Sequence, residues 1–309
     1  MNVTSGGLVR MIAPRFFESG IMRIRFYTQM EISMFVNTRS FTLLVLLSVF
    51  SGLALAQPAK KEYEPSVGQS GKDVVWVPTP QALVDRMLDM AKLTPADIHY
   101  DLGSGDGRTV ITAAKRGGKA YGIEYNPDMV ELARRNAQKE GMADKAIFKH
   151  GDIFTEASKK DYMQASVITL FLLPDLNVKL RPTLLDMKPG VRVVSNSFTM
   201  GDWAADQTIA AGGDCTSWCT AYLWIIPAKV GGTWKTSRGD LTLKQEYQML
   251  SGNLARGNVT GIVSEAKMSG DQITFTAAGT QYTGRVNGNT IEGAYKGGDG
   301  SGKWTATKQ

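Results

Sequence analysis

The chain has 309 residues and a formal net charge of +6 at pH 7, with 43% hydrophobic and 21% charged residues. This length is typical of a protein with about two domains. Its Lys and Arg residues are scattered among acids, whereas a nucleic-acid-binding domain usually carries them in clusters on a strongly basic surface. The composition therefore argues against a nucleic-acid partner.

The N-terminal part carries a pattern typical of an export signal. Residues 41–50 are an apolar run that follows Arg39 and precedes the small-residue site Ala54-Leu55-Ala56. This order is typical of a secretory signal peptide cleaved after Ala56, and the run is shorter than the ~20 residues of a membrane-spanning helix. We expect residues 1–56 to be an N-terminal extension plus signal peptide, with Met34 as the true start.

Removal of residues 1–56 takes away five Arg and two acids, which lowers the net charge to about +3. The mature protein is then expected in the periplasm, without a stable membrane span. An uncleaved N-terminal membrane anchor is the alternative.

Residues 57–74 are polar and contain Lys, Pro and Gly, so they are expected to form a flexible connecting segment. From residue 75 to residue 227, apolar strand patterns alternate with helical periodicity. The predicted helices are Pro80–Leu93, Arg108–Arg116, Pro127–Glu140 and Asp175–Met187, with Thr79 as a possible N-cap of the first. The predicted strands are Ile98–Leu102, Lys119–Glu124, Ala146–Lys149, Ser166–Phe171, Val191–Ser197 and Ala221–Ile226. This alternation indicates an α/β, Rossmann-like doubly wound parallel sheet that is covered on both faces.

The sequence pattern of residues 228–309 differs from that of residues 75–227, because Gly becomes frequent and helical periodicity disappears. Short alternating runs are separated by turn pairs, of which Asn287-Gly288 is a strong hairpin signal. We predict a small antiparallel all-β domain, either a meander or a small barrel. The segment contains no catalytic constellation, so its expected role is stabilisation or partner docking.

A glycine-rich turn between the first predicted strand and the following helix carries most of the functional information. It reads Asp101-Leu102-Gly103-Ser104-Gly105-Asp106-Gly107-Arg108, and Glu124 ends the next predicted strand. Such glycines let the backbone turn sharply and approach a ligand, and an acid at the second strand end is placed to bind a ribose. The G-x-G-x-G spacing differs from the dinucleotide fingerprint G-x-G-x-x-G, and Asp106 lies where a phosphate would approach. A cationic nucleoside cofactor is favoured over NAD.

These residues resemble motif I of the seven-strand, class I S-adenosylmethionine-dependent methyltransferases. The resemblance implies that S-adenosyl-L-methionine is the cofactor and that Asp152 binds the adenine amine, with Ile153 or Phe154 packing on the ring. His150 is interpreted as a structural residue. The cofactor-binding candidates are Thr79, Asp101, Gly103, Ser104, Gly105, Gly107, Glu124, Asp152 and Ile153.

The segment after the fourth predicted strand reads Thr169-Leu170-Phe171-Leu172-Leu173-Pro174. It lacks the Asn/Asp-Pro-Pro-Tyr/Phe tetrad of methyltransferases that act on amides or bases, which argues against DNA-adenine or glutamine methylation. An apolar wall suits a flexible alkyl amine instead. The candidates for the acceptor channel are Phe171, Leu172 and Trp203, and no residue is assigned a catalytic role.

Further motifs narrow the resemblance. Val77-Pro78-Thr79-Pro80, Leu172-Leu173-Pro174 and Lys179-Leu180-Arg181-Pro182 are similar to the archaeal broad-specificity protein-lysine methyltransferases and the mitochondrial lysine methyltransferases. This resemblance implies a methyltransferase domain over residues 75–227 that methylates protein lysine by in-line transfer, with Thr79 near the methionine end of the cofactor. A small-molecule methyltransferase acting on a small amine and a non-catalytic exported binding protein are the alternatives.

The two cysteines, Cys215 and Cys219, lack the further Cys or His residues of a zinc site, so no metal is expected. In an oxidising compartment they could form a disulfide if the segment turns. In an extended strand they would lie too far apart and remain two thiols. The sequence leaves both possibilities open.

Overall fold

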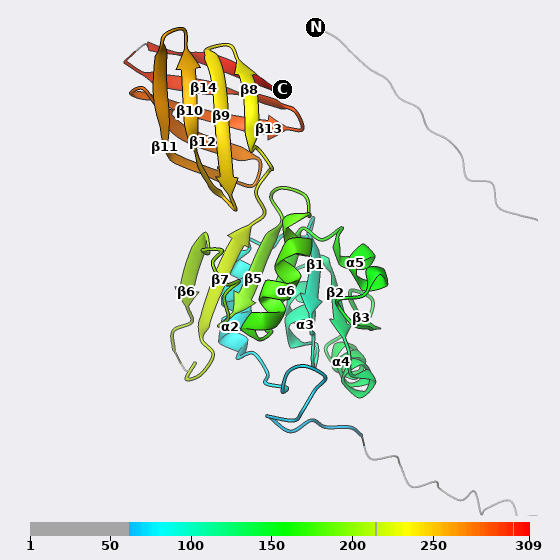
Figure 1. Ribbon diagram of the computed structural model, residues 1–309. Helices are drawn as coiled ribbons and strands as arrows, with labels where there is room; N and C mark the ends of the chain where they lie inside the picture. The colour runs from blue at the N-terminus through cyan, green and yellow to red at the C-terminus, as the bar shows by residue number, and fades with distance from the viewer. Residues whose placement is uncertain (1–61, 214, 299) are drawn as a thin grey trace, which may run out of the picture. The chain divides into compact units, whose positions relative to one another are not determined.

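The computed structural model describes residues 62–213, 215–298 and 300–309, and the predicted signal peptide and start Met34 lie outside them (Figure 1). The chain forms a seven-stranded sheet in the order β3-β2-β1-β4-β5-β7-β6 and a closed eight-stranded barrel. The predicted fold class, a Rossmann-like α/β sheet followed by a small antiparallel all-β domain, is confirmed.

The seven-stranded sheet is parallel from β1 to β5 and antiparallel at its other edge. Its strands are β1 (Ile98–Leu102), β2 (Lys119–Glu124), β3 (Ala146–His150), β4 (Val167–Leu170), β5 (Arg192–Asn196), β6 (Gln207–Ala210) and β7 (Thr220–Ile225). β7 pairs antiparallel with β5 and with β6. An all-parallel sheet was therefore the wrong expectation for this edge. β6 was not predicted, because its four residues are mostly exposed and show no apolar pattern.

Within the described ranges, the helices beside these strands are α2 (Gln81–Met90), α3 (Arg108–Lys115), α4 (Pro127–Lys139), α5 (Glu156–Tyr162) and α6 (Pro174–Leu185). α4 begins where Asn126 accepts hydrogen bonds from the N–H groups of Asp128 and Met129, with Pro127 in the first turn. Thr79 does not cap α2, since the N-cap residue is Pro80. α5 was missed because its seven residues, EASKKDY, have little apolar periodicity. None of the described helices is long and apolar enough to cross a membrane.

Helices pack on both faces of the sheet. One core cluster joins α6, through Leu180 and Leu184, to Leu102 of β1. A separate cluster joins α3 and α4 to the opposite face, where Phe148 of β3 is buried. In Figure 1, α6 crosses one face of the sheet. The two clusters hold the carboxyl ends of β1 to β4 at one edge, where the ligands of open α/β sheets bind.

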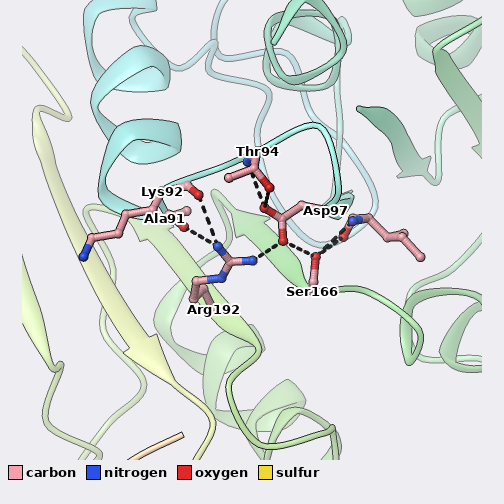
Figure 2. A network of polar contacts seen from close by, with 7 residues as sticks. Ala91, Lys92, Thr94, Asp97, Ser166 and Arg192 are labelled. Carbon is pink, nitrogen blue, oxygen red and sulfur yellow. Dashed lines mark hydrogen bonds and ion pairs between the residues drawn. The ribbon is translucent and has the colours of Figure 1, made fainter. Parts of the chain in front are cut away.

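A polar network ties the opposite edge together (Figure 2). Asp97, Ser166 and Arg192 stand at the beginnings of β1, β4 and β5. Asp97 pairs with Arg192 and accepts a 2.6 Å hydrogen bond from Ser166 Oγ. Arg192 also donates to the carbonyl of Ala91, just after α2, at 2.7 Å. Burial would raise the pKa of Asp97, but hydrogen bonds from Ser166, Thr94 and Arg192 outweigh it and hold that pKa below its usual range.

The barrel is an antiparallel meander in which the first and last strands also pair. Its strands are β8 (Gly232–Thr236), β9 (Gly239–Glu246), β10 (Met249–Arg256), β11 (Val259–Ser269), β12 (Gln272–Ala277), β13 (Thr280–Asn287), β14 (Thr290–Gly297) and β15 (Gly300–Lys308). Trp234, Phe275, Tyr282 and Trp304 are almost fully buried in its core. Strand crowding accounts for some of the glycines, since a Cβ on Gly293 would lie 1.9 Å from the carbonyl oxygen of Thr283.

Candidate functional site

An open cavity lies at the carboxyl ends of β1 to β4. In the strand order β3-β2-β1-β4, the chain reverses direction across the sheet after β3, so the cavity lies at the topological switch point. The cavity is lined by eight of the nine cofactor-binding candidates, namely Thr79, Asp101, Gly103, Ser104, Gly105, Glu124, Asp152 and Ile153. Five carboxylates line it together with one Lys and one Arg, so its wall carries an excess of negative charge.

The glycine turn shapes the floor of this cavity. Gly103 and Gly105 have φ angles of +84° and +51°, in the left-handed region that favours glycine. A Cβ on Gly105 would lie 2.9 Å from Trp76 Nε1, so any side chain there would press against the cavity wall. The hydroxyl of Ser104, at the cavity floor, is buried without a hydrogen-bond partner.

Gly107, the ninth candidate, does not line the cavity. It precedes α3 with a φ of +84°, and a Cβ there would lie 2.6 Å from the Phe148 ring and 2.9 Å from Ala133. Close packing of α3 and α4 against β3 therefore requires glycine at this position. The contact is with protein rather than with a ligand.

Asp101 is 6% exposed at the end of β1 and faces the cavity. Thr169 Oγ1 donates to its Oδ1 at 2.6 Å, and His99 Nε2 lies 2.9 Å from the same hydroxyl. Burial, together with the nearby carboxylates of Glu124 and Asp106, raises the pKa of Asp101 to about 7 despite the Thr169 hydrogen bond, which lowers it. Burial also lowers the pKa of His99 to about 3, which keeps its imidazole neutral. Because the Thr169 hydroxyl donates its proton to Asp101, His99 donates through Nε2.

The two other acids near the turn are held by protein donors. Glu124 accepts from the N–H groups of Gly105 and Asn126, each at 2.9 Å. Asp106 is paired with Arg108, whose Nη2 lies 2.6 Å from Oδ2. This pairing corrects the expectation that Asp106 presents a free negative charge to the ligand. Arg108 also donates to the carbonyl of Thr79, whose hydroxyl accepts from Asn196 at 3.3 Å.

Asp152 is engaged by the segment that was expected to be a flexible connection. Lys72 Nζ donates to its Oδ2 at 2.5 Å, and the Phe154 N–H donates to its Oδ1 at 2.9 Å. The Lys72 hydrogen bond, more than any other contact, lowers the pKa of Asp152. The Lys72 ammonium also lies 4.8 Å from the centre of the Tyr125 ring. Sequence reasoning missed Lys72 and Tyr125, because a single Lys in a polar segment and a Tyr after a strand carry no motif.

The acceptor-channel candidates separate into two groups. Phe171 and Leu172 line the cavity beside β4. Trp203 does not, since it is 1% exposed, stacks on Tyr247 and donates through Nε1 to Gln248 at 2.8 Å. Trp203 is therefore a packed core residue rather than a channel residue.

Two aromatic residues that the sequence did not single out, Phe198 and Trp218, contact Phe171 instead. Trp218 lies between Cys215 and Cys219, which form a disulfide with a Cα–Cα distance of 5.8 Å. The sequence left open whether these cysteines form a disulfide or remain two thiols. The segment turns and brings the two sulfurs together, so they form the disulfide. Among the residues that the structure describes, no group of three or more His, Cys, Asp or Glu side chains could hold a metal ion.

The sequence profile of the ANTKMT methyltransferase domain family matches residues 101–207. A protein-lysine N-methyltransferase from Saccharolobus islandicus is 41% identical over 156 residues, which cover 50% of this chain and 94% of that protein. The chain belongs to the S-adenosylmethionine-dependent methyltransferases. The family's cofactor, S-adenosylmethionine, is therefore the cofactor of this methyltransferase.

Two further relatives show how far the similarity extends. The adenine nucleotide translocase lysine N-methyltransferase of Mus musculus is 34% identical to this methyltransferase over 141 residues, covering 45% of the chain and 58% of the mouse protein. A crystal structure from Salinibacter ruber, described as an RNA methyltransferase in complex with S-adenosyl-L-homocysteine, is 46% identical, with a TM-score of 0.45. It covers 50% of this chain and 96% of its own.

The residues of the cavity fit a sulfonium cofactor. The buried Asp101 carboxylate and the excess of acids suit a ligand that carries positive charge. The positive φ angles of the glycine turn allow the backbone to approach a ligand closely.

Proposed function

We propose that this methyltransferase transfers a methyl group to the side-chain amine of lysine in a protein. The observation that carries the proposal is the apolar wall of Phe171 and Leu172 in a cavity otherwise rich in carboxylates. Such a wall accommodates the four-carbon stem of lysine, while the acids attract its ammonium group. The relative from Saccharolobus islandicus, a protein-lysine N-methyltransferase, supports the same acceptor class.

In this proposal the cofactor lies across the carboxyl ends of β1 to β3. Asp101 accepts hydrogen bonds from the ammonium group of the methionine moiety, and Glu124 accepts from the ribose hydroxyls. Asp152 accepts from the adenine amine, with Ile153 packing against the ring. The floor at Gly103, Ser104 and Gly105 allows close approach of the backbone, and Thr79 closes the methionine end.

When bound, S-adenosylmethionine supplies an electrophilic methyl group on a positively charged sulfur. The chain contributes orientation and exclusion of water, which brings the acceptor amine into line with the methyl group. Lysine must be neutral to act as a nucleophile, and its ordinary pKa is ~10.4. Phe171 and Leu172 disfavour the charged form of an amine that packs against them, which lowers its pKa and opposes the cavity carboxylates, which raise it. The amine would lose its proton to solvent before it packs against these side chains. Transfer would then form the N–CH3 bond as the S–CH3 bond breaks, which leaves S-adenosylhomocysteine.

The proposal is tested by transfer of a labelled methyl group from S-adenosylmethionine to proteins of a cell extract, followed by amino-acid analysis. We expect label on lysine, and we expect Asp101→Asn to reduce the transfer at least about 100-fold because the cofactor loses a charge-assisted anchor. Asp144→Asn changes an exposed acid in the turn before β3 and serves as the matched control. Label found only in small metabolites or in RNA would contradict the proposal.

We also propose that residues 1–56 direct export to the periplasm and are then removed after Ala56. The Cys215–Cys219 disulfide supports this location, because disulfides persist in oxidising compartments. N-terminal sequencing of the protein purified from a bacterial host tests the cleavage. A protein that retains residues before Gln57 would contradict cleavage and favour the anchored alternative.

A further inference from the structure

Three aromatic rings form a cluster next to β4, and one of them, Phe171, lines the cofactor cavity. Phe171 follows β4, Phe198 follows β5 and Trp218 precedes β7. Their ring centres lie 5.4 to 6.1 Å apart, so each ring touches the other two. We call Phe171, Phe198 and Trp218 the aromatic wall. Phe171 belongs both to this wall and to the lining of the cavity, which makes the two surfaces continuous.

The aromatic wall is open to solvent rather than part of the core. Trp218 is 44% exposed, and Phe171 and Phe198 are only half-buried. A tryptophan side chain is normally buried or in contact with a partner, because its ring has a large apolar surface. The exposed ring therefore has area available for a ligand.

The backbone beside the wall is held in unusual conformations. Trp218 has a φ of +56°, and Ser197, next to Phe198, has a φ of +57°. Non-glycine residues in the left-handed region are strained, and they cluster at sites that bind ligands. Two of the three wall residues therefore lie at, or directly beside, a strained position.

The disulfide fixes the loop that presents Trp218. Cys215 and Cys219 bracket the tryptophan, and both pack against a core cluster that contains Ala211 and Ala221. The cross-link closes a loop so short that Trp218 has little freedom to move away from Phe171 and Phe198. A ring positioned in this way loses little conformational entropy when a ligand packs against it.

We infer that the aromatic wall is the binding surface for the acceptor lysine side chain, and that the Cys215–Cys219 disulfide positions Trp218 for this role. The inference rests on the proposed lysine acceptor and adds the residues that select it. The polar candidates for the cofactor lie on β1 to β3, whereas the wall lies over β4, β5 and β7 of the same sheet edge. The acceptor therefore approaches from the β4 side, with Phe171 as the boundary between the two ligands.

The chemistry of the wall suits an alkyl ammonium group. Aromatic faces attract cations, most strongly through tryptophan, and each such contact contributes about 0.5–2 kcal/mol. The lysine stem packs on the apolar rings while its amine points past Phe171 toward the carboxylate-rich cavity. Methylated lysine keeps its positive charge, so the same wall also accepts a partly methylated acceptor for a further round.

Steady-state kinetics with a short Gly/Ser peptide that carries one central lysine test the inference. We expect Trp218→Ala to raise the KM for this peptide about ten-fold and to leave the dissociation constant of S-adenosylhomocysteine within about two-fold. Trp218→Phe should restore most of the affinity, because it keeps an aromatic face. Ile262→Ala on the barrel, at a side chain that is 78% exposed, is the surface control.

The disulfide is tested with Cys215→Ser combined with Cys219→Ser. This variant should raise the KM for the peptide toward that of Trp218→Ala, while cofactor binding stays unchanged. A KM that remains at the wild-type value in both variants would overturn the inference.

A second readout separates the inference from the proposed function. The indole N–H signal of Trp218, assigned by its loss in Trp218→Phe, is followed by NMR during titration with the lysine peptide and with its norleucine counterpart. A shift with lysine alone supports the aromatic wall even if no methyl group is transferred, in which case only the proposed function fails. Methylation of the peptide without a Trp218 shift and with an unchanged KM in Trp218→Ala overturns the inference and leaves the proposed function standing.

Discussion

The position of Asp101 makes its ionised form costly for the stability of the fold but suits the binding of a cation. Its carboxylate is buried beside Glu124 and Asp106, and burial raises its pKa to about 7. The Thr169 hydroxyl, backed by His99, holds the carboxylate oriented toward the cavity. A positively charged ligand in the cavity therefore favours the ionised form of Asp101, which loses its proton when the ligand binds.

Cofactor affinity should consequently depend on pH near neutrality. Asp101 binds an ammonium group only in its ionised form, so the dissociation constant for S-adenosylmethionine should rise as the pH falls below about 7, by up to ten-fold per pH unit. The comparison stays below about pH 8, because the ammonium group of the cofactor loses its own proton above it. Isothermal titration calorimetry across this range measures the effect, and Asp101→Asn should bind weakly at every pH. A flat profile in the wild type would contradict the raised pKa.

Asp101→Asn should also stabilise the fold at alkaline pH. The folded pKa lies above the unfolded value of 3.8, so the contribution of Asp101 to stability is present below that value and is lost as the pH rises through about 7. At pH 8 the variant should gain on the order of 2 kcal/mol in unfolding free energy, and near pH 4 it should match the wild type. Urea denaturation at the two pH values provides the measurement.

At the scale of elements, the segment before α2 covers the cofactor cavity. Lys72 binds the carboxylate of Asp152, which is the proposed partner of the adenine amine. The segment and the cofactor would then share one carboxylate, and we expect the Lys72 ion pair to weaken the hydrogen bond that Asp152 offers to the cofactor.

Lys72→Met should therefore strengthen cofactor binding, by about three-fold, because Asp152 no longer shares its carboxylate with Lys72. Asp152→Asn should weaken binding instead. Lys229→Met, which removes another exposed ion pair, should have no effect. If Lys72→Met weakened binding as much as Asp152→Asn, Lys72 would instead belong to the bound state. Fluorescence or calorimetric titration with S-adenosylhomocysteine distinguishes these outcomes.

The network at the other edge of the sheet predicts a stability effect. Arg192 joins Asp97 to the end of α2 from the beginning of β5. Arg192→Met should cost about 2–4 kcal/mol, because it leaves a largely buried carboxylate unpaired. The exposed pair of Arg285 and Asp271 is the control, and Arg285→Met should cost less than about 1 kcal/mol. Chemical denaturation measures both variants.

The same network has a definite pH dependence. The folded pKa of Asp97 is lowered, so its contribution is present above the unfolded value of 3.8 and is lost as the pH falls through the folded pKa. The difference in stability between the wild type and Asp97→Asn should therefore shrink below about pH 4.

The elements that were predicted from the sequence are those with strong local signals. β1, β2, α3 and α4 combine buried apolar runs with glycine turns or a capped, proline-led start. α5 and β6 are short and polar, and β10, with the sequence MLSGNLAR, lacks regular alternation. Their formation depends on neighbouring strands and helices, which local periodicity does not record.

The site shows the same division. Asp101, Glu124 and Asp152 lie at or just after the carboxyl ends of β1, β2 and β3. The positions of the predicted strands in the sequence were therefore enough to identify them. Lys72 and Trp218 come from segments far away in sequence, and only the folded chain brings them to Asp152 and Phe171. Trp203 was misjudged because its acceptor, Gln248, is 45 residues away.

At the scale of the whole molecule, Gln248 links the barrel strands to the α/β domain. It is 3% exposed, its Oε1 accepts from Trp203, and its Nε2 donates to the carbonyl of Ala204 at 2.7 Å. Tyr247 adds a stacked ring on Trp203 and a hydrogen bond to Asp202. This link fixes a buried indole of one domain with side chains of the other.

Gln248→Ala should lower the unfolding free energy by about 1–3 kcal/mol, since it leaves the Trp203 N–H and the Ala204 carbonyl without partners. Gln281→Ala, at an exposed position on β13, should be nearly neutral. Differential scanning calorimetry should then show a lower transition temperature for Gln248→Ala alone. Equal temperatures for both variants would mean that water replaces the lost partners.

The pairing of β8, the first strand of the barrel, with β15, the last, closes the barrel. Lys308 pairs with Trp234, and the N–H of Gln309 donates to the carbonyl of Thr233 at 2.9 Å. Residues 308 and 309 are thus held by backbone contacts to β8, the first strand of the barrel. A purification tag or reporter would need a flexible spacer there, whereas the tight turn at Asn287-Gly288 is where a circular permutant of the isolated barrel could be opened.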